Sequence, residues 1–259
     1  MQFFSNKKQI FYLIYAIGFL AAAIIYARPQ KPEQVDYPKN FRVLVFSKTL
    51  GYRHASIPDG IAAIRSLGEE SGFTVDATED AAVFTDENLK QYRVIVFLSP
   101  SGNGLFNQEQ REAFVKFIQG GGGFAGIHAA TTAEYVWPWY GRLVGNYFKT
   151  HPPIQEAVTR VTDPAHPSTV MLPEQWPRRD EWYEFRLPFS PDLRILVTVD
   201  ESTYSGGMTG VRHPVTWCHE YDGGRAWYTA MGHSSEDYQD PLFRRHILGG
   251  ILWASGRKR

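Results

Sequence analysis

Between residues 41 and 127, short apolar segments alternate with helix-forming segments, and this alternation constrains the fold more than any other feature of the sequence. Four segments have the composition of strands that are buried on both faces, namely 41–46, 73–75, 94–98 and 124–127. Repeated strand–helix–strand units are typical of α/β proteins. The sequence therefore predicts an open, mostly parallel sheet flanked by helices.

Helix signals stand between these apolar segments. Ser56 precedes Pro58 and a run of isoleucines at helical spacing, and Gly72 ends that run. Asn107 and Gln110 form a capping-box pattern before a second helix. These boundaries place one helix between the first two strands and another before the fourth.

After about residue 150 the pattern changes to strands without intervening helices. The segments 154–161, 195–199, 215–219 and 226–231 read as strands, and the pair Gly223–Gly224 predicts a hairpin turn between the last two. Asp240–Pro241 starts a final helix. We interpret residues 41–256 as one domain.

The first 28 residues have a different character. Lys7 and Lys8 precede an uncharged apolar run at 10–27, which predicts a signal peptide or a membrane anchor. No clean small-residue cleavage site follows, which favours an uncleaved anchor. The positive-inside rule then exports the remainder, anchored to the inner membrane and facing the periplasm or the cell exterior, or secreted if the segment is cleaved. Residues 29–40, with three prolines, read as a linker.

Charge and cysteine content exclude several classes of function. The chain has 27 basic and 27 acidic residues, so it lacks the basic footprint of a nucleic-acid-binding protein. Its single cysteine, Cys218, excludes an internal disulfide framework and a cysteine-cluster metal site.

The glycine-rich stretch 122–130 is the most informative candidate site. His128 stands where the strand ends, with the small residues Gly126 and Ala130 two positions to either side. This spacing is that of a nucleophile elbow, a strained turn that exposes one side chain. A helix is expected to begin near Thr131, and the backbone N–H of Ala129 could stabilise an anion there. The alternative is a core histidine after a glycine-rich loop.

Two further histidines follow predicted strands. His54 comes shortly after the first strand and His233 directly after the last. If these strands are parallel neighbours, both side chains converge with His128 at the carboxyl edge of the sheet, where open α/β sheets bind ligands. Taken singly, each could equally be a surface or capping residue.

Other candidates lie between residues 151 and 217. Asp180 and Glu181 could supply a carboxylate for acid–base chemistry, since the neighbouring aromatic residues could desolvate it. Arg212 or His213, at the entry to a strand, could grip a polar ligand. His151 and His166 stand in proline-rigid turns, where a loop residue and a ligand are alternatives.

No cofactor is required by these patterns, but a divalent metal is possible. Three histidines (His54, His128 and His233) together with a carboxylate could bind zinc or a similar ion. No H-E-x-x-H or equally local motif is present, so the spacing does not decide the matter.

Several motifs in order resemble the ThuA-like (trehalose-utilisation) family of the glutamine-amidotransferase-like fold superfamily, over roughly 41–256. The resemblance rests on the segments 51–54, 121–130, 180–183, 213–217 and 232–236. It implies the fold, with flavodoxin-like layering, and a small-molecule sugar as substrate. The superfamily places a cysteine at the elbow and a histidine after a late strand, positions that hold His128 and His233 in this sequence. Without the thiol, the glutaminase route through a thioester has no nucleophile.

The family usually accompanies sugar oxidoreductases, which also implies 3-keto-glycosides as substrates. Acid–base chemistry suffices for a reaction of such sugars. Such a reaction needs a base, an acid and a group that stabilises the enolate oxygen. The hypothesis assigns Glu181 or Asp180 as base and His128 or His233 as acid. The Ala129 N–H, His54 or a bound metal would stabilise the enolate. Tyr183, Trp217 and Arg212 would hold the sugar ring.

The type of activity stays open at this stage. Cleavage and isomerisation of the sugar need the same groups. The alternatives are a membrane-tethered sugar-binding module without catalysis and an envelope-partner module. The exact substrate and the oligomeric state are likewise open.

Overall fold

A computed structural model of the chain describes residues 31–34 and 36–256. The chain divides into two compact units, Met1–Lys31 and Pro32–Arg259. The predicted signal or anchor segment at 1–28 lies outside the described residues. Within the described ranges, no helix combines the length and hydrophobicity that crossing a bilayer requires.

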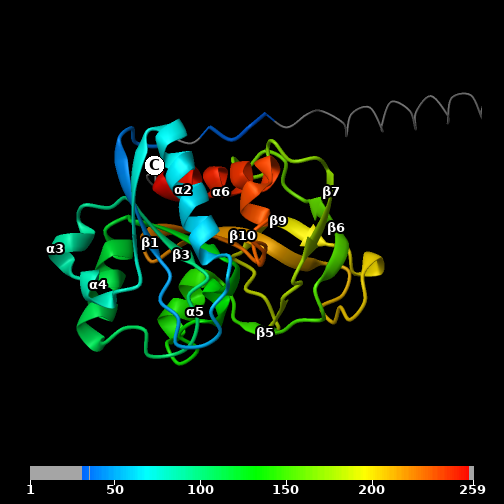
Figure 1. The fold of residues 1–259 in the computed structure, drawn as a ribbon, viewed down its shortest axis with the longest axis horizontal. Helices are drawn as coiled ribbons and strands as arrows, with labels where there is room; N and C mark the ends of the chain where they lie inside the picture. Colours follow the sequence, from blue (N-terminus) through cyan, green and yellow to red (C-terminus); the bar gives the residue numbers. More distant parts are fainter. Residues whose placement is uncertain (1–30, 35, 257–259) are drawn as a thin grey trace, which may run out of the picture. The chain divides into compact units, whose positions relative to one another are not determined.

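A nine-stranded sheet with the order β2–β1–β3–β4–β11–β10–β9–β6–β7 forms the centre of the second unit (Figure 1). Its strands are β1 (Phe41–Phe46), β2 (Phe73–Thr78), β3 (Val94–Leu98), β4 (Gly123–Ile127), β6 (Gln155–Val161), β7 (Gln175–Asp180), β9 (Arg194–Val199), β10 (His213–Tyr221) and β11 (Gly224–Thr229). Two short strands, β5 (Phe148–Thr150) and β8 (Glu184–Phe185), pair separately.

The sheet is mixed, which modifies the expectation of a mostly parallel one. From β2 to β11 neighbouring strands are parallel, as the alternating pattern predicts. From β11 to β7 every pairing is antiparallel. The direction reverses at the predicted hairpin, whose turn residues are Asp222 and Gly223, with φ values of 48° and 94°. Positive φ at both positions is the signature of a type I′ turn, which suits the twist of paired strands.

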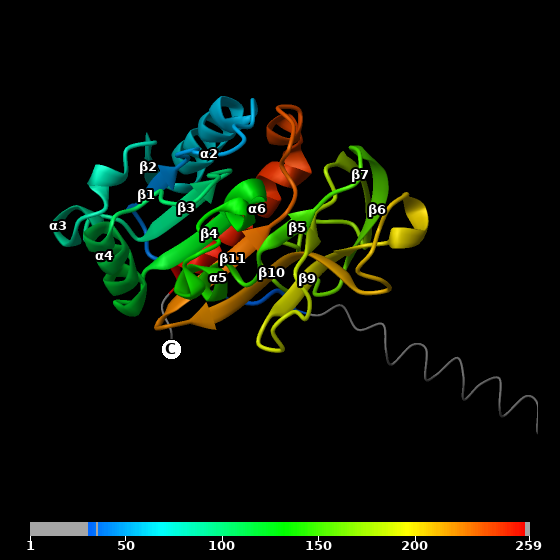
Figure 2. The ribbon, with the colours of Figure 1, turned by 90° about the horizontal axis from the view of Figure 1, so that it is seen from below.

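Helices cover both faces of the sheet (Figures 1 and 2). Helices α2 (Ile57–Ser71) and α6 (Pro241–Ser255) pack together on one face. The other face carries α3 (Asp86–Leu89), α4 (Gln108–Gln119) and α5 (Pro138–Val144). Four 3-10 helices lie in the loops: η1 (Ala81–Val83), η2 (His128–Thr132), η3 (Glu201–Thr203) and η4 (Asp237–Gln239).

The sequence signals for the longer helices are confirmed. Helix α2 starts after Ser56 and ends at Gly72, which adopts φ 78°, although the Ser56 side chain makes no capping hydrogen bond. At α4 the capping box between Asn107 and Gln110 is complete in both directions. The boundaries of both helices are therefore encoded by residues at their ends, independently of tertiary packing.

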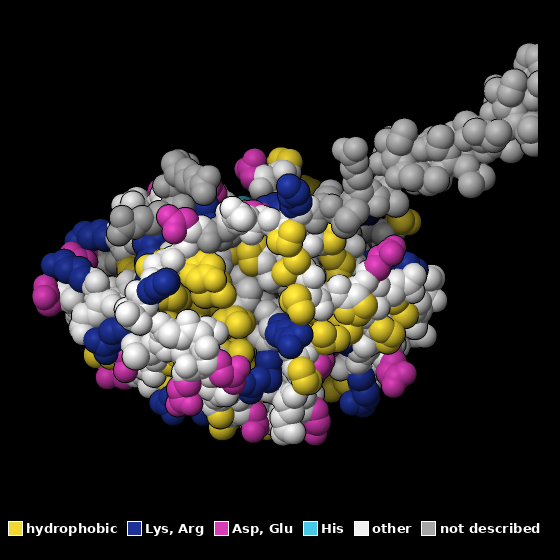
Figure 3. Space-filling model, turned by 90° about the horizontal axis from the view of Figure 1, so that it is seen from above, with side chains coloured by type: hydrophobic (Ala, Val, Ile, Leu, Met, Phe, Trp, Pro, Cys, Tyr) yellow, Lys and Arg dark blue, Asp and Glu magenta, His cyan; other side chains and the backbone are white. Residues whose placement is uncertain are grey.

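The surface shown in Figure 3 carries acidic and basic side chains interspersed around apolar ones. Neither sign of charge dominates this face. That distribution agrees with the balanced composition and with the absence of a basic footprint in the sequence.

Candidate functional site

Strand β4 ends in a sharp turn at His128, which has φ 50° and is fully buried. The small neighbours are needed: a Cβ atom on Gly126 would lie 3.1 Å from the Cβ of Ala130 and 3.0 Å from the ring of Tyr228. The predicted elbow is therefore present. The short helix η2 begins at His128 itself, three residues earlier than Thr131.

Five side chains from four loops converge at this elbow. The Nε2 atom of His128 lies 3.1 Å from Nε2 of His54, 3.3 Å from Nδ1 of His233 and 3.5 Å from Oε2 of Glu181. The hydroxyl of Tyr183 is 3.1 Å from the same Nε2 atom. Because β1, β4 and β11 are parallel, the loops after them meet at one edge, as predicted for the three histidines.

The ring of His128 is fixed by its other nitrogen. Its Nδ1 atom lies 2.6 Å from the carbonyl oxygen of Ala230. Since a carbonyl only accepts, Nδ1 carries the proton in the neutral ring and Nε2 presents a lone pair to the cluster. The hydrogen bond to the Ala230 carbonyl, directly after β11, thus assigns the tautomer of His128.

His151 is a group that the sequence pattern left open and the structure brings to the site. Its Nδ1 atom lies 3.2 Å from Oε1 of Glu181, whereas His128 and His233 contact the other oxygen, Oε2. The His151 side chain is 39% exposed, whereas that of Glu181 is 10% exposed. His151 therefore connects the buried carboxylate to solvent. The only local signal for it was a rigid turn before Pro152 and Pro153.

Burial and mutual contact set the protonation of the cluster. Burial, together with the neighbouring His128 and His233, lowers the pKa of His54 to about 3. Burial alone would raise the pKa of Glu181, but the contact with His128 and the hydrogen bond from His233 hold it well below its usual range. The same bond to Glu181 raises the pKa of His233. Burial raises the pKa of Tyr183 well above 10, so its hydroxyl keeps its proton at neutral pH.

Asp180, one of the two residues predicted as a base, bonds backbone groups of the site. Its carboxylate accepts hydrogen bonds from the backbone N–H groups of Glu181, Gly232 and His233, at 2.8, 3.0 and 3.3 Å. These bonds occupy three of the roughly four acceptor sites of the carboxylate. Asp180 thereby ties the Glu181 loop to the His233 loop.

The predicted ligand-holding residues separate into three groups. Tyr183 is in the cluster, and Ala129 follows His128 at the buried start of η2. Trp217 is a core residue: it is fully buried, and its indole N–H donates to the carbonyl of Val144. Arg212 is exposed on the loop before β10.

His213 supports the site from behind. It is fully buried, and its Nε2 atom lies 2.8 Å from the carbonyl oxygen of Tyr183. Its Nδ1 atom lies 2.9 Å from a carboxylate oxygen of Glu201. His213 therefore fixes the backbone that carries Tyr183 and does not face the cluster.

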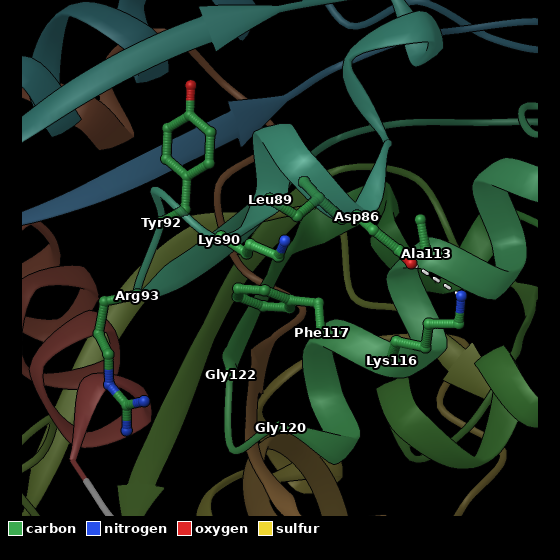
Figure 4. A pocket seen from close by; sticks show the side chains of 10 residues that line it. All are labelled: Asp86, Leu89, Lys90, Tyr92, Arg93, Ala113, Lys116, Phe117, Gly120 and Gly122. Atoms are coloured by element: carbon green, nitrogen blue, oxygen red, sulfur yellow. Dashed lines mark hydrogen bonds and ion pairs between the residues drawn. The ribbon is translucent and has the colours of Figure 1, made fainter.

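A surface pocket of about 530 Å³ lies elsewhere, between α3 and α4 at the amino ends of β3 and β4 (Figure 4). Its cations are already paired: Lys116 with Asp86 at 2.8 Å and Lys90 with Glu87 at 3.1 Å. The histidine cluster stands at the opposite ends of these strands, so this pocket is separate from the candidate site.

Two groups of side chains in the described part of the chain could hold a metal ion. The first is the cluster of His54, His128, His233 and Glu181, whose ligand atoms all lie within 4.8 Å of one another. The second consists of Glu184, Glu201 and His213, likewise within 4.8 Å.

The comparisons with known proteins support one family. The family model described as trehalose utilisation, ThuA, matches residues 42–254. A ThuA-like protein from Bacteroides uniformis ATCC 8492 superposes with a TM-score of 0.70 at 25% identity, over 87% of this chain and 95% of that one. A second, from Parabacteroides merdae ATCC 43184, has a TM-score of 0.68 at 21% identity, over 84% and 90%.

A more distant likeness concerns the fold alone. The β-galactosidase from Rahnella sp. R3 matches with a TM-score of 0.51 at 12% identity, over 83% of this chain and 31% of that one. The search of curated proteins gave no match. The family match covers most of the domain, including every loop of the cluster, and the chain belongs to the ThuA family.

Proposed function

We propose that this protein is a carbohydrate-processing enzyme that acts on 3-keto-glycosides or related keto sugars by acid–base chemistry. The observation that carries the proposal is the convergence of three imidazoles, a carboxylate and a phenol at the elbow. The family's description, trehalose utilisation, supports a sugar as the substrate. Strained, buried polar clusters of this kind are typical of reaction centres.

A 3-keto sugar needs few catalytic groups. The ketone acidifies the neighbouring C2–H, so a base can remove that proton while the developing enolate oxygen is stabilised. The glycosidic oxygen at C1 then leaves with a proton from an acid. Isomerisation uses the same deprotonation and returns the proton elsewhere. Both reactions balance without an oxidant.

The site contains groups for each role. His151 and Glu181, in contact at 3.2 Å, form the proton-accepting pair, with His151 as the member that exchanges protons with solvent. The Tyr183 hydroxyl, which stays protonated, can donate to the enolate oxygen or to the leaving group. Among the imidazoles, His233 is placed to donate to the ketone oxygen, because its contact with Glu181 raises its pKa.

An exposed aromatic ring also fits a sugar. Tyr52 is 69% exposed, and its ring packs edge-on against His54 with 4.8 Å between ring centroids. It offers an apolar platform to one face of a pyranose.

The test is turnover of 3-keto-trehalose and a 3-keto-β-glucoside, followed by NMR, with the unoxidised sugars as a substrate control. His128→Asn should lower kcat by at least about 100-fold, within the usual range for acid–base groups. Asparagine tolerates the left-handed backbone at this position. His219→Asn is the matched control, because His219 is buried and bonds the Leu143 carbonyl outside the cluster.

Each result has a consequence. Turnover that survives His128→Asn undiminished would remove the elbow from the reaction. Binding of keto sugar without products would favour a sugar-binding module. Absence of both would contradict the choice of substrate class.

A further inference from the structure

More polar atoms surround Nε2 of His128 than its single lone pair can hydrogen-bond. Four of them lie within 3.5 Å: Nε2 of His54, Nδ1 of His233, Oε2 of Glu181 and the Tyr183 hydroxyl. Because Nδ1 of His128 binds the Ala230 carbonyl, Nε2 accepts, and one lone pair accepts one good hydrogen bond. A carboxylate oxygen beside it can only accept as well. A cation between these atoms would satisfy the lone pairs of His128 and Glu181 together.

The spacing of these atoms is that of ligands around one ion. Zinc–nitrogen and zinc–oxygen bonds of about 2.0–2.1 Å place neighbouring tetrahedral ligands about 3.3–3.4 Å apart. In the cluster, the separations are 3.1 Å (His54–His128), 3.3 Å (His128–His233), 3.3 Å (His233–Glu181) and 3.5 Å (His128–Glu181). The remaining ligand pairs also lie within 4.8 Å.

The surroundings orient three of the four ligands, namely His128, His233 and Glu181. His128 donates its other N–H to a backbone carbonyl, the arrangement that orients a metal-binding imidazole. Asp180 fixes the backbone at Glu181 and His233 through three hydrogen bonds. The second oxygen of Glu181 is held by His151. The outer contacts of His128 and Glu181 are thus already in place.

The second His–Glu group shows what a saturated cluster looks like. The two oxygens of Glu184 accept from Met208 N and from the Thr209 hydroxyl. One oxygen of Glu201 accepts from the backbone N–H of Thr209 and Gly210. Hydrogen-bond donors therefore satisfy this group without an ion. The contrast points to the elbow cluster as the metal site.

We propose that Nε2 of His54, Nε2 of His128, Nδ1 of His233 and Oε2 of Glu181 bind one divalent transition-metal ion of the zinc class. Three imidazoles and one carboxylate are ligands that suit such ions. Tyr183 and His151 lie beside the ligands and stay available for proton transfer. The inference deepens the proposed function, for which the ion would supply the polarising centre, but its geometric basis is independent of the substrate.

Metal content of the full-length purified protein is the first measurement. Elemental analysis should give about one zinc-class ion per chain. Protein stripped with a chelator should rebind one equivalent of Zn²⁺ in calorimetry, and Co²⁺ should produce the visible absorption of a tetrahedral site. A folded wild-type protein, verified by circular dichroism, that binds neither ion would overturn the proposal.

Substitutions test which side chains are ligands. His54→Ala and His233→Ala should each weaken Zn²⁺ binding by more than about 100-fold, beyond the effect of outer contacts. The isosteric Glu181→Gln should weaken it by at least tenfold and guards against a folding failure in the alanine variants. His219→Asn should bind Zn²⁺ like the wild type. Equal binding by wild type, His54→Ala and His233→Ala would place the ion elsewhere and contradict the site.

The two proposals fail in different ways. Turnover of keto sugars by fully metal-free protein would refute the ion as the polarising centre and leave the enzymatic proposal standing. One bound ion without turnover of any keto sugar would refute the enzymatic proposal and leave the metal site standing.

Discussion

At the scale of single residues, His128 combines two costs that native chains usually avoid. Its backbone adopts φ 50°, and its imidazole is fully buried. Left-handed backbone in a residue other than glycine costs of the order of 1–3 kcal/mol, and a buried polar ring must find partners. The turn directs the imidazole of His128 toward the polar side chains that three other loops bring to the site. The strain is thus associated with a site instead of with the core.

Tyr183 is expected to contribute to turnover through its hydroxyl alone. Tyr183→Phe keeps the ring that packs on His128 and Phe148 but removes the O–H that lies 3.1 Å from His128 Nε2. We expect kcat to fall about 100-fold with little change in KM. Steady-state kinetics on a keto-glycoside checks this.

Tyr204→Phe is the control for that variant. The Tyr204 hydroxyl contacts His213 Nδ1, outside the cluster. Equal rates for Tyr183→Phe and wild type would exclude the phenol from proton transfer.

The sequence predicts site residues that directly follow a strand. It does not predict those whose place depends on how the strands pair in the sheet. His54 and His233 were placed by the strands before them. The role of Trp217 could not be predicted, because it depends on which face of the sheet the side chain occupies in β10. In the structure that side chain lies in the core. Asp180 and Glu181 are adjacent in sequence, so only the hydrogen bonds of Asp180 to distant backbone separate their roles.

At the scale of elements, β4 is a strand that requires small residues. A Cβ atom on Gly123 would lie 2.3 Å from the carbonyl oxygen of Ala254 in α6, whereas one on Gly126 would meet only side chains, at 3.0 Å and beyond. Side chains can shift more easily than a helix backbone. Glycine at 123 therefore allows α6 to cross β4 closely.

This contrast predicts a ranking of two alanine variants. Gly126→Ala should lower the free energy of unfolding by about 1–3 kcal/mol, as overpacking usually does. Gly123→Ala should lower it further, because it forces α6 away from the sheet. Urea denaturation of both proteins measures the order, and a Gly123→Ala protein as stable as Gly126→Ala would contradict the packing argument.

Strand β7 was not predicted because most of its buried positions are charged. Its pattern alternates exposed and buried residues, and the buried ones are Trp176, Arg178 and Asp180. Two of these three are charged, so the period-two apolar signal of a half-buried strand is absent. The charges are tolerated because Arg178 pairs with Asp237 and Asp240 and stacks on the Trp176 ring.

Removing Arg178 should therefore be costly. Arg178→Met leaves Asp180 and Asp237 buried without their cation, and we expect a loss of about 3–5 kcal/mol in the free energy of unfolding. Arg160→Met removes an exposed pair with Asp200 and should cost less than about 1 kcal/mol. Denaturant titrations that gave equal losses would contradict the role of burial.

At the scale of the whole molecule, buried neutral histidines tie stability to pH. Burial lowers the pKa of His166 to about 2 and that of His246 to about 3, against about 6.5 in an unfolded chain. Below pH 6.5 the unfolded chain therefore binds two protons that the folded chain does not. Their contribution to stability is complete above pH 6.5 and is lost as the pH falls.

The expected slope is about 1.4 kcal/mol per pH unit for each of these histidines between pH 6 and 4. Unfolding by urea at pH 7.5, 6 and 5 measures it. His246→Gln should make the dependence shallower by one proton, whatever its effect on stability at pH 7.5. A wild-type free energy of unfolding that did not change from pH 7 to 5 would contradict this linkage.

The pairing of β4 with β11 has a consequence for biosynthesis. Gly123 pairs with Arg225, which is made 102 residues later. At about 5–20 residues per second, a growing chain carries one side of β4 unpaired for roughly 5–20 s after that strand is complete. An open edge of small and apolar residues invites pairing with other chains. The interval before Gly224–Thr229 emerges is therefore when this protein most needs a chaperone.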